Sequence, residues 1–397
     1  MRVLFIAFDS GELSVRLASA LAEEVEDLCL MLAKQAAAPH LRLLSSRVNF
    51  HPFYRPRLRD VFQQLRLMVR LIRYIRRYNP DVIHLQKSHL WFSLALPLLQ
   101  HYPLVISIHD PRDHTGDQFS RRTPQTIKDF GYRRADRVIA HNEQMKQVII
   151  EELGISEEII HIVPLVERGD PTLQPDVAEE DNLVLFFGRI WEYKGLAYFI
   201  KAEPLVTKQI PEARFVIAGR GDDFAPYERM MINRENFIVH NEFVSYEKRA
   251  ELFRRASVVV LPYIEATQSG VIPVAYSHGK PVIATRVGGL PAQMEDGQTG
   301  FLVPPRDEKA LADKIIRLLR DKTLRRRLGA NARRKLETEW SAEAVAKKTI
   351  PVYEAAIRGV SQNCAQKVES DVNRVKPVHV ARSFFTGDNT RGAHHDE

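Results

Sequence analysis

The chain has 397 residues, long for one domain and sufficient for two domains that each bury a core. Its composition is that of a globular protein with a formal net charge of +7, which favours anionic partners such as nucleic acid, anionic lipid or phosphate-bearing substrates. No apolar run is long enough to cross a bilayer, and two distant cysteines, Cys29 and Cys364, do not form a disulfide framework.

The first half of the chain alternates strand-like and helix-like segments. Apolar runs typical of strands lie at residues 2–8, 81–85, 104–108 and 138–140, and helical segments lie at 12–24 and 143–153. This alternation predicts right-handed crossovers and a doubly wound parallel sheet. Because a strand opens the chain, in place of a basic-then-apolar leader, we expect a cytoplasmic protein.

The first strand-to-helix turn, residues 8–12, is a candidate ligand site. It lacks the G-x-G-x-x-G pattern, which argues against a dehydrogenase. Gly11 would let a substrate approach the backbone, and we expect Gly11 and Glu12 to line the site. His109, at the end of strand 104–108, and His114, in the following loop, are further candidates, although a strand-end histidine can equally serve packing.

A basic segment at residues 55–77 contains many arginines between apolar residues. Apolar side chains recur at helical spacing, at Phe62, Leu65, Val69, Ile72 and Ile75. We therefore predict an amphipathic helix that buries this side on the N-terminal domain. Its arginines offer a second role, a contact with anionic lipid headgroups.

The polar, proline-containing residues 167–181 are predicted to link two domains. A second alternating series follows, with strands at 183–187, 214–218, 258–261 and 281–284 and helices at 196–208, 246–255, 271–277 and 308–319. The predicted organisation is an N-terminal domain (1–166), the linker (167–181), a C-terminal domain (182–340), a helix (341–358) that can pack back on the N-terminal domain, and a flexible tail (359–397).

Two cations follow a strand in the second domain. After the strand ends at Gly188, Arg189 and Lys194 lie in the loop before the next helix. At the carboxyl end of a parallel strand such a loop points positive charge into the ligand crevice, where Arg can grip phosphate bidentately. A basic loop in contact with solvent is the alternative.

A second strand-loop-helix junction spans residues 261–271. Ser269 is predicted to cap the helix, and Gly270 lets a ligand reach the unpaired amides of the first turn, which attract phosphate. Glu265 lies just before them and could accept hydrogen bonds from sugar hydroxyls. An ordinary capped helix with a surface glutamate is the alternative.

These segments, in this order, resemble retaining glycosyltransferases of family 4, which have the GT-B fold of two Rossmann-like domains facing each other across a cleft. The resemblance is strongest over residues 183–320 and continues more weakly over 1–165. The matching stretches are 188–195, 215–221, 256–262, 265–270, 279–285, 287–291 and 297–304.

The resemblance implies a role for each matching residue. Arg189 and Lys194 would hold the donor diphosphate, Glu265 would lie beside the transferred sugar, and His109 would lie near the sugar or the acceptor. The other implied donor contacts are Gly188, Gly219, Val244, Gln268, Ser269, Gly270 and Val271. On the acceptor side the implied contacts are Gly11, Glu12, His109 and His114.

One position departs from the family pattern. The family's second glutamate, which binds the ribose, is replaced here by Pro273 when positions are counted forward from Glu265. When they are counted back from residues 279–281, it is replaced by Val274. Neither side chain can accept a hydrogen bond from a hydroxyl group. A catalytically impaired scaffold or a nucleotide-sugar-binding protein therefore stays open as an alternative. A phosphorylase, an epimerase and a nucleic-acid-binding protein lack supporting motifs.

The expected activity is transfer of a sugar from a nucleotide-sugar donor to a glycan or lipid-linked acceptor with retention of configuration. Exopolysaccharide, lipopolysaccharide or glycolipid synthesis would be its setting. The sequence has no Asp-x-Asp loop and no His/Cys cluster with ligand spacing, so fixed positive charge is expected to act without a metal or cofactor. A peripheral contact with the inner face of an anionic membrane would suit a lipid-linked acceptor.

Overall fold

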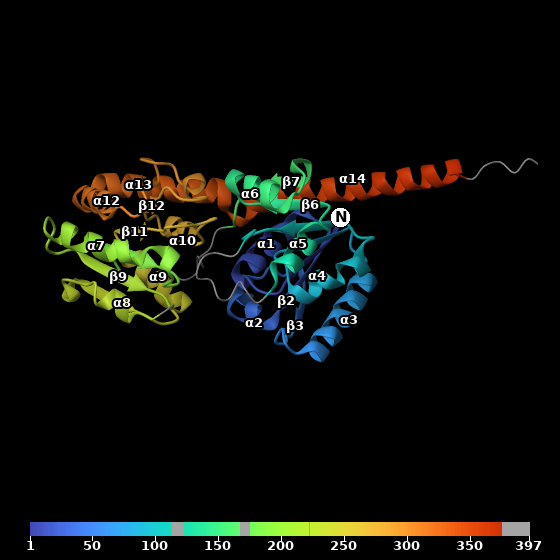
Figure 1. The fold of residues 1–397 in the computed structure, drawn as a ribbon, viewed down its shortest axis with the longest axis horizontal. Coiled ribbons are helices and arrows are strands. Elements are labelled where there is room, and N and C mark those ends of the chain that lie inside the picture. Colours follow the sequence, from blue (N-terminus) through green and yellow to red (C-terminus); the bar gives the residue numbers. More distant parts are fainter. Residues whose placement is uncertain (113–122, 167–174, 222, 375–397) are drawn as a thin grey trace, which may run out of the picture.

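The computed structural model describes residues 1–112, 123–166, 175–221 and 223–374, which form two α/β lobes side by side (Figure 1). Within the described residues, the N-terminal lobe contains one seven-stranded parallel sheet. Its strands, in spatial order, are β3 (Val48–Phe53), β2 (Asp27–Ala33), β1 (Arg2–Ala7), β4 (Val82–Leu85), β5 (Leu104–Ser107), β6 (Arg137–Ala140) and β7 (Ile160–Ile162). Its helices are α1 (Gly11–Glu24), α2 (Lys34–Ala37), α3 (Val61–Tyr78), α4 (Leu90–Ala95), α5 (Gln125–Tyr132) and α6 (Glu143–Leu153).

The C-terminal lobe repeats this plan with a six-stranded parallel sheet in its described part. Its strands, in spatial order, are β10 (Phe237–His240), β9 (Arg214–Ala218), β8 (Leu183–Phe187), β11 (Val258–Leu261), β12 (Val282–Thr285) and β13 (Gly300–Val303). Its helices are α7 (Leu196–Thr207), α8 (Ala225–Glu228), α9 (Tyr246–Arg255), α10 (Val271–Ser277), α11 (Leu290–Gln293), α12 (Glu308–Arg320) and α13 (Lys322–Lys335). The central strands are apolar on both faces because helices cover both sides of each sheet.

The last helix, α14 (Ala342–Arg374), leaves the C-terminal lobe and runs back along the N-terminal one (Figure 1). It packs on α1, and the Tyr353 hydroxyl lies 2.6 Å from Nδ1 of the buried His84, whose Nε2 lies 2.8 Å from Oγ of Ser107. The helix extends past residue 358, where we predicted a flexible tail to begin. The helix continues to Arg374 because residues 360–374 contain neither glycine nor proline to stop it. Residues 375–397 lie outside the described residues.

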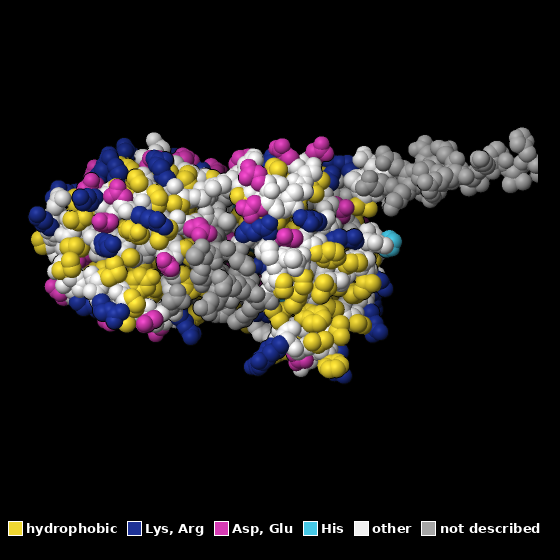
Figure 2. All heavy atoms as spheres, in the orientation of Figure 1, with side chains coloured by type: hydrophobic (Ala, Val, Ile, Leu, Met, Phe, Trp, Pro, Cys, Tyr) yellow, Lys and Arg dark blue, Asp and Glu magenta, His cyan; other side chains and the backbone are white. Residues whose placement is uncertain are grey.

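Helix α3 is amphipathic, as predicted, but the predicted buried side is only partly right. Ile72 and Ile75 are buried, whereas Phe62 is 80% exposed and Leu65 and Val69 are about half exposed. The buried stripe runs instead through Gln64, Leu67, Met68, Leu71, Ile72, Ile75 and Tyr78. This stripe follows the i, i+3, i+4, i+7 spacing more closely, but it begins at a buried polar residue, Gln64, which apolar spacing does not detect. Figure 2 shows a hydrophobic area over α3 and α4.

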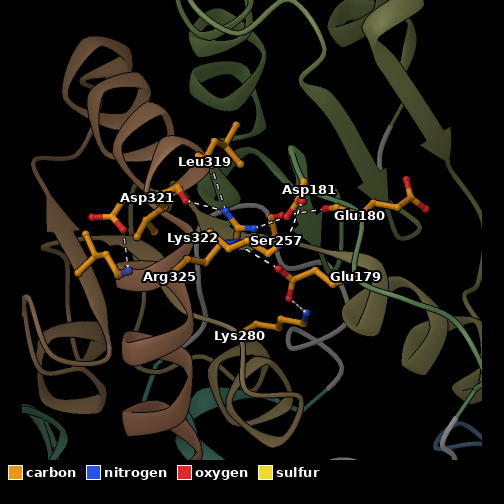
Figure 3. Close-up of polar contacts among 11 residues, drawn as sticks. Glu179, Glu180, Asp181, Ser257, Lys280, Leu319, Asp321, Lys322 and Arg325 are labelled. Carbon is orange, nitrogen blue, oxygen red and sulfur yellow. Dashed lines mark hydrogen bonds and ion pairs between the residues drawn. The ribbon is translucent and has the colours of Figure 1, made fainter.

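Part of the predicted linker is fixed to the C-terminal lobe, while residues 167–174 lie outside the described residues. The buried guanidinium of Arg325 donates to Oε1 of Glu179 at 3.1 Å and to Oδ1 of Asp181 at 2.6 Å (Figure 3). It also donates to two backbone carbonyls at the end of α12, at 3.0 and 3.3 Å. Lys280 pairs with the other oxygen of Glu179. Residues 179–181 are therefore part of the C-terminal lobe.

Candidate active site between the lobes

The candidate active site lies where the carboxyl ends of the strands of both sheets face each other. From the N-terminal lobe come the segments that follow β1, β4, β5 and β6, which are residues 9–10, 86–87, 109–110 and 141–142. From the C-terminal lobe come residues 188–195, after β8, and 262–270, after β11. Carboxyl ends of parallel strands are where open α/β sheets bind ligands, so the two lobes present their binding edges to each other.

Three hydrogen bonds join these edges directly. The hydroxyl of Thr267 donates to Oδ1 of Asp110 at 2.9 Å, and Nε2 of Gln268 donates to the backbone carbonyl of His109 at 3.2 Å. In the other direction, Nδ2 of Asn142 donates to the carbonyl of Thr267 at 3.4 Å. The loop before α10 therefore touches the N-terminal lobe, and Gln268 contacts it from the C-terminal lobe.

Arg189 and Lys194 occupy the C-terminal wall of this cleft. The exposed Arg189 lines a pocket shared with the N-terminal lobe, and its guanidinium carbon lies 3.9 Å from the centre of the Trp191 ring. The half-buried Lys194 places Nζ 3.8 Å from the centre of the Tyr263 ring. The backbone of this loop is fixed to the neighbouring one, since Ile264 donates its N–H to the Tyr193 carbonyl at 2.8 Å. The two predicted cations thus lie together, facing the other lobe.

The charge of Lys194 is weakened by its surroundings. Burial, in the first place, and the nearby Arg189 lower the pKa of its ammonium group to about 7, against the opposing effect of Asp110 on the other lobe. A phosphate group bound here would favour the charged form. The amine is therefore poised to gain a proton when an anion arrives.

The start of α10 differs in detail from the prediction. Gly270, and not Ser269, is the capping residue, because Ser269 is fixed one position earlier. Gln293 receives the Ser269 N–H at 2.7 Å and donates to its carbonyl at 3.1 Å, while the Ser269 hydroxyl receives the Val271 N–H at 3.2 Å. The Ser269 and Val271 amides thus already have acceptors. Among the described residues, the Gly270 amide has no acceptor in the chain.

The two carboxylate positions of the family motif differ in the structure. Glu265 is exposed in the loop before α10. Pro273 and Val274, which stand where a second carboxylate would grip ribose, are buried inside α10. A ribose contact from either position is excluded because these side chains are apolar and packed in the core of the C-terminal lobe.

His109 belongs to a chain of hydrogen bonds inside the N-terminal lobe. Nδ1 of His141 faces the Val163 carbonyl at 2.9 Å and must carry a proton. With neutral rings, Nε2 of His141 accepts from Nδ1 of His109 at 3.2 Å, and Nε2 of His109 accepts from the Gln86 amide at 3.1 Å. Both ring nitrogens of His109 are therefore engaged within the lobe, and its backbone carbonyl meets Gln268.

Two glycines of the predicted site serve packing. A Cβ on Gly11 would lie 1.8 Å from the Ala36 carbonyl oxygen, so helix α2 fills the space that we assigned to substrate. A Cβ on Gly219, at φ 147°, would lie 1.9 Å from the carbonyl oxygen of Gly188, so this glycine lets β9 and β8 end side by side. Val244 is half-buried just before α9.

The predicted acceptor residue Glu12 is engaged with the other lobe. Its carboxylate accepts two hydrogen bonds from Arg249 of α9, both at 3.2 Å, and both side chains are nearly buried. Beside it, the hydroxyl of Tyr246 lies 2.9 Å from Nε2 of His40. Glu12 therefore joins the lobes. The remaining predicted acceptor residue, His114, lies outside the described residues.

A pocket of about 470 Å³ opens between Arg189 and the N-terminal lobe. Its described lining residues are Asp9, Arg55, Pro56, Arg57, Leu58, Lys87, Ser88, His89, Asp110, Thr123, Lys128, Tyr132 and Arg189. Arg55, Arg57 and Lys87 were not predicted as residues of this cleft from the sequence. Lys87 was recognisable, since it follows a strand end as Arg189 does, whereas Arg55 and Arg57 were included in the basic helix.

Within the described residues, no three His, Cys, Asp or Glu side chains form a group that could hold a metal ion. None of the described helices is both long and apolar enough to traverse a bilayer.

Comparisons with known proteins agree on one group. Residues 14–165 match the family described as Glycosyltransferase Family 4, and residues 181–321 match Glycosyl transferases group 1. An uncharacterized glycosyltransferase of Methanocaldococcus jannaschii is 30% identical over 183 residues, 46% of this chain and 47% of that relative. The D-inositol 3-phosphate glycosyltransferase of Pseudarthrobacter chlorophenolicus is 29% identical over 388 residues, 88% of this chain and 91% of the relative. The structure of Anabaena HepE in complex with UDP superposes with a TM-score of 0.65 at 18% identity, covering 89% of this chain and all of that one.

Proposed function

Because the chain belongs to the family-4 glycosyltransferases with the GT-B fold, we propose that it transfers a sugar from a nucleotide-sugar donor to a hydroxyl acceptor with retention of configuration. The observation that carries this proposal is the pair of cations, Arg189 and Lys194, at the carboxyl edge of one sheet and facing Asp110 of the other lobe. A fold neighbour was solved with UDP, so a uridine diphosphate sugar is the first donor to test.

In the proposed reaction the bond between the anomeric carbon and the diphosphate oxygen breaks, and the acceptor oxygen bonds to the same face of that carbon. The acceptor's proton passes to the departing phosphate. Arg189, Lys194 and the Gly270 amide stabilise the negative charge that builds up on the leaving group. Glu265 orients the sugar and does not form a covalent bond with it. His109, whose two ring nitrogens are engaged within the N-terminal lobe, lies behind the sugar and does not hydrogen bond to it.

We propose that this charge stabilisation needs no metal ion. A guanidinium and an ammonium supply the positive charge that a divalent cation supplies in other transferases. Turnover should therefore be unchanged by EDTA, and loss of activity that added magnesium restores would contradict the proposal.

The acceptor is proposed to be a glycan or a lipid-linked molecule of polysaccharide, lipopolysaccharide or glycolipid synthesis. The exposed Phe62, Leu65 and Val69 on α3, beside exposed arginines, support a peripheral contact with an anionic membrane surface. Flotation with neutral and with anionic vesicles tests this contact. Preference for the anionic vesicles is expected, and equal binding to both would contradict it.

Alanine substitution tests the catalytic assignment. Arg189→Ala should lower turnover of the nucleotide sugar by about 10²–10³-fold, as does removal of a preorganised donor to a developing oxyanion. Arg326→Ala, an exposed arginine of α13, is the matched control and should leave turnover unchanged. Normal turnover in Arg189→Ala would refute the assignment. Absence of both transfer and donor hydrolysis in the wild-type protein would favour the catalytically impaired scaffold.

A further inference from the structure

Four cations of the N-terminal lobe line the pocket opposite Arg189, and one of them, Lys128, is buried. The other three are the half-buried Arg55 and Lys87 and the exposed Arg57. Within the described residues none of the three has a carboxylate within 4 Å, although two acidic side chains, Asp9 and Asp110, line the same pocket. Cations gathered without partners repel one another, so this arrangement is suited to an anionic ligand.

The backbone of the loop that carries the two arginines is held firmly. Gln35 donates to the Arg55 carbonyl and accepts from its N–H, both at 3.2 Å. The buried Gln64 donates to the Pro56 carbonyl at 3.1 Å, and the indole N–H of Trp91 donates to the Leu58 carbonyl at 3.1 Å. Side chains from three different segments thus fix residues 55–58, and a ligand would find its partners already in place.

One arm of the Arg55 guanidinium is also fixed, since Nη1 donates to the Phe8 carbonyl at 2.6 Å at the end of β1. The remaining guanidinium nitrogens keep their capacity to donate. Because the group is planar and always charged, a single arginine held in this way can donate to two oxygens of a phosphate.

His89 adds a second, independent observation. Its ring is buried in the pocket wall and stacks on Phe8, with the two ring centres 3.9 Å apart. Neither of its ring nitrogens has a hydrogen-bond partner among the described residues. Burial, with a smaller effect of Arg55, lowers the pKa of the ring to about 4, so it is neutral at physiological pH and offers one N–H donor. A buried polar group without a partner is costly. Both nitrogens are closed off from solvent in the structure, so a ligand oxygen would satisfy one of them once the pocket wall shifts.

The donor diphosphate accounts for Arg189 and Lys194 but not for the cations on the opposite wall. We propose that Arg55, Arg57 and Lys87 bind a phosphate group of the acceptor, so that the enzyme glycosylates a phosphate-bearing acceptor. A single carboxylate would match one arginine, whereas three cations match the charge and the three free oxygens of a phosphate ester. This inference rests on the proposed function, since it names the acceptor class of the same site.

Two kinds of acceptor carry such a group, a soluble phosphate ester and a lipid phosphate. Leu58 lines the pocket, and the exposed Phe62 of α3 follows four residues later, at most about 14 Å away along the chain. The exposed apolar side of α3 would thus lie close to the alkyl part of a lipid phosphate. The shared chemistry is the phosphate, and the experiment separates the two sources.

The first arm measures binding of inorganic phosphate to the full chain saturated with UDP, so that the donor site is occupied. Arg55→Gln and Lys87→Gln should each weaken phosphate binding roughly tenfold or more, the effect of losing a charge-assisted hydrogen bond. Arg59→Gln, an exposed arginine of the same loop that does not line the pocket, is the matched control and should bind phosphate as the wild type does. Equal phosphate binding in all four proteins would overturn the proposal.

The second arm compares flotation with phosphatidylcholine vesicles that contain or lack phosphatidic acid. Binding to phosphatidic acid that depends on Arg55 and Lys87 supports a lipid phosphate, whereas loss of inorganic phosphate binding alone supports a soluble ester. If both variants still bind the phosphatidic acid vesicles and also bind inorganic phosphate as the wild type does, the vesicles adsorb elsewhere on the protein. This outcome would overturn the proposal.

The UDP-induced rise in melting temperature, measured for every variant, distinguishes failure of the proposed glycosyltransferase function from failure of the proposed phosphate site. It should persist in Arg55→Gln and Lys87→Gln, which shows that they are folded and bind the donor. If the wild-type protein itself gave no such rise, the proposed function would fail, and phosphate titration of Arg189→Ala would still test the pocket.

Discussion

The clearest quantitative consequence of the structure is a pH dependence of donor binding. Lys194 has a pKa of about 7, lowered chiefly by burial beside two tyrosine rings, and we propose that its charge binds the donor diphosphate. A lowered lysine pKa means that the free protein loses this charge as the pH rises through 7. With that pKa the amine is ~90% protonated at pH 6 and ~10% protonated at pH 8, so donor affinity should fall about tenfold, or ~1.4 kcal/mol, across this interval.

The assay is titration calorimetry with UDP-glucose in the absence of acceptor. Both phosphates of a nucleotide sugar are esterified and stay ionised throughout this range, so only the protein titrates, whereas free UDP would itself change charge near pH 6. Binding should also be accompanied by proton uptake that is largest near pH 8, where the free amine is neutral. Buffers with different ionisation enthalpies reveal this uptake.

The control is Lys194→Gln, which keeps a polar side chain but has no proton to gain. It should bind more weakly than the wild type at pH 6 and show a much flatter profile. Other groups near the cleft, including His109 and His141, are present in both proteins, so the difference between the two curves isolates Lys194. A flat wild-type profile between pH 6 and 8, or an unchanged slope in Lys194→Gln, would refute the reasoning.

Three further substitutions test features of the fold. Arg325→Met should lower the free energy of unfolding by about 2–3 kcal/mol in denaturant titrations, because it removes the buried guanidinium that pairs with two partly exposed carboxylates. Arg326→Met is the control, and equal stability of the two variants would contradict the role of the buried arginine. Gly195→Ala should lower the melting temperature, since Gly195 has φ 67° and its new Cβ would lie 1.9 Å from a backbone oxygen; an unchanged value would exclude this clash. Glu12→Gln removes the ion pair with Arg249 between the lobes and should increase the radius of gyration in X-ray scattering, whereas an unchanged radius would show that the pair does not hold the lobes together.

The fold was predictable because its signal is local. Each apolar run that we predicted as a strand is a parallel strand in the structure, and the alternation of strands with helices indicated the two-lobe plan. Strands β2, β3, β7, β10 and β13 were not predicted. The buried side of α3 was predicted only in part because Gln64, a polar residue with a backbone acceptor, occupies a core position. Sequence periodicity cannot recognise a buried amide whose partner lies in the preceding loop.

The candidate site was predictable only where its residues follow strand ends. Arg189, Lys194, His109 and Gln268 all lie at the cleft for that reason. The engagement of Glu12 with Arg249 could not be foreseen, because it depends on how one lobe meets the other. Arg55 and Arg57 could not be assigned to the cleft either, because their segment was interpreted as part of the basic helix.

The path of the chain also determines when the N-terminal lobe can be completed. The face of its sheet that α1 and α14 cover together stays partly bare until the last helix has been made, and the buried His84 meets its Tyr353 partner only then. During synthesis the C-terminal lobe leaves the ribosome before that helix, so the lobe made first is finished last. A fragment ending at residue 166 would leave this apolar surface open to water, and is expected to aggregate unless α14 is supplied as a separate peptide.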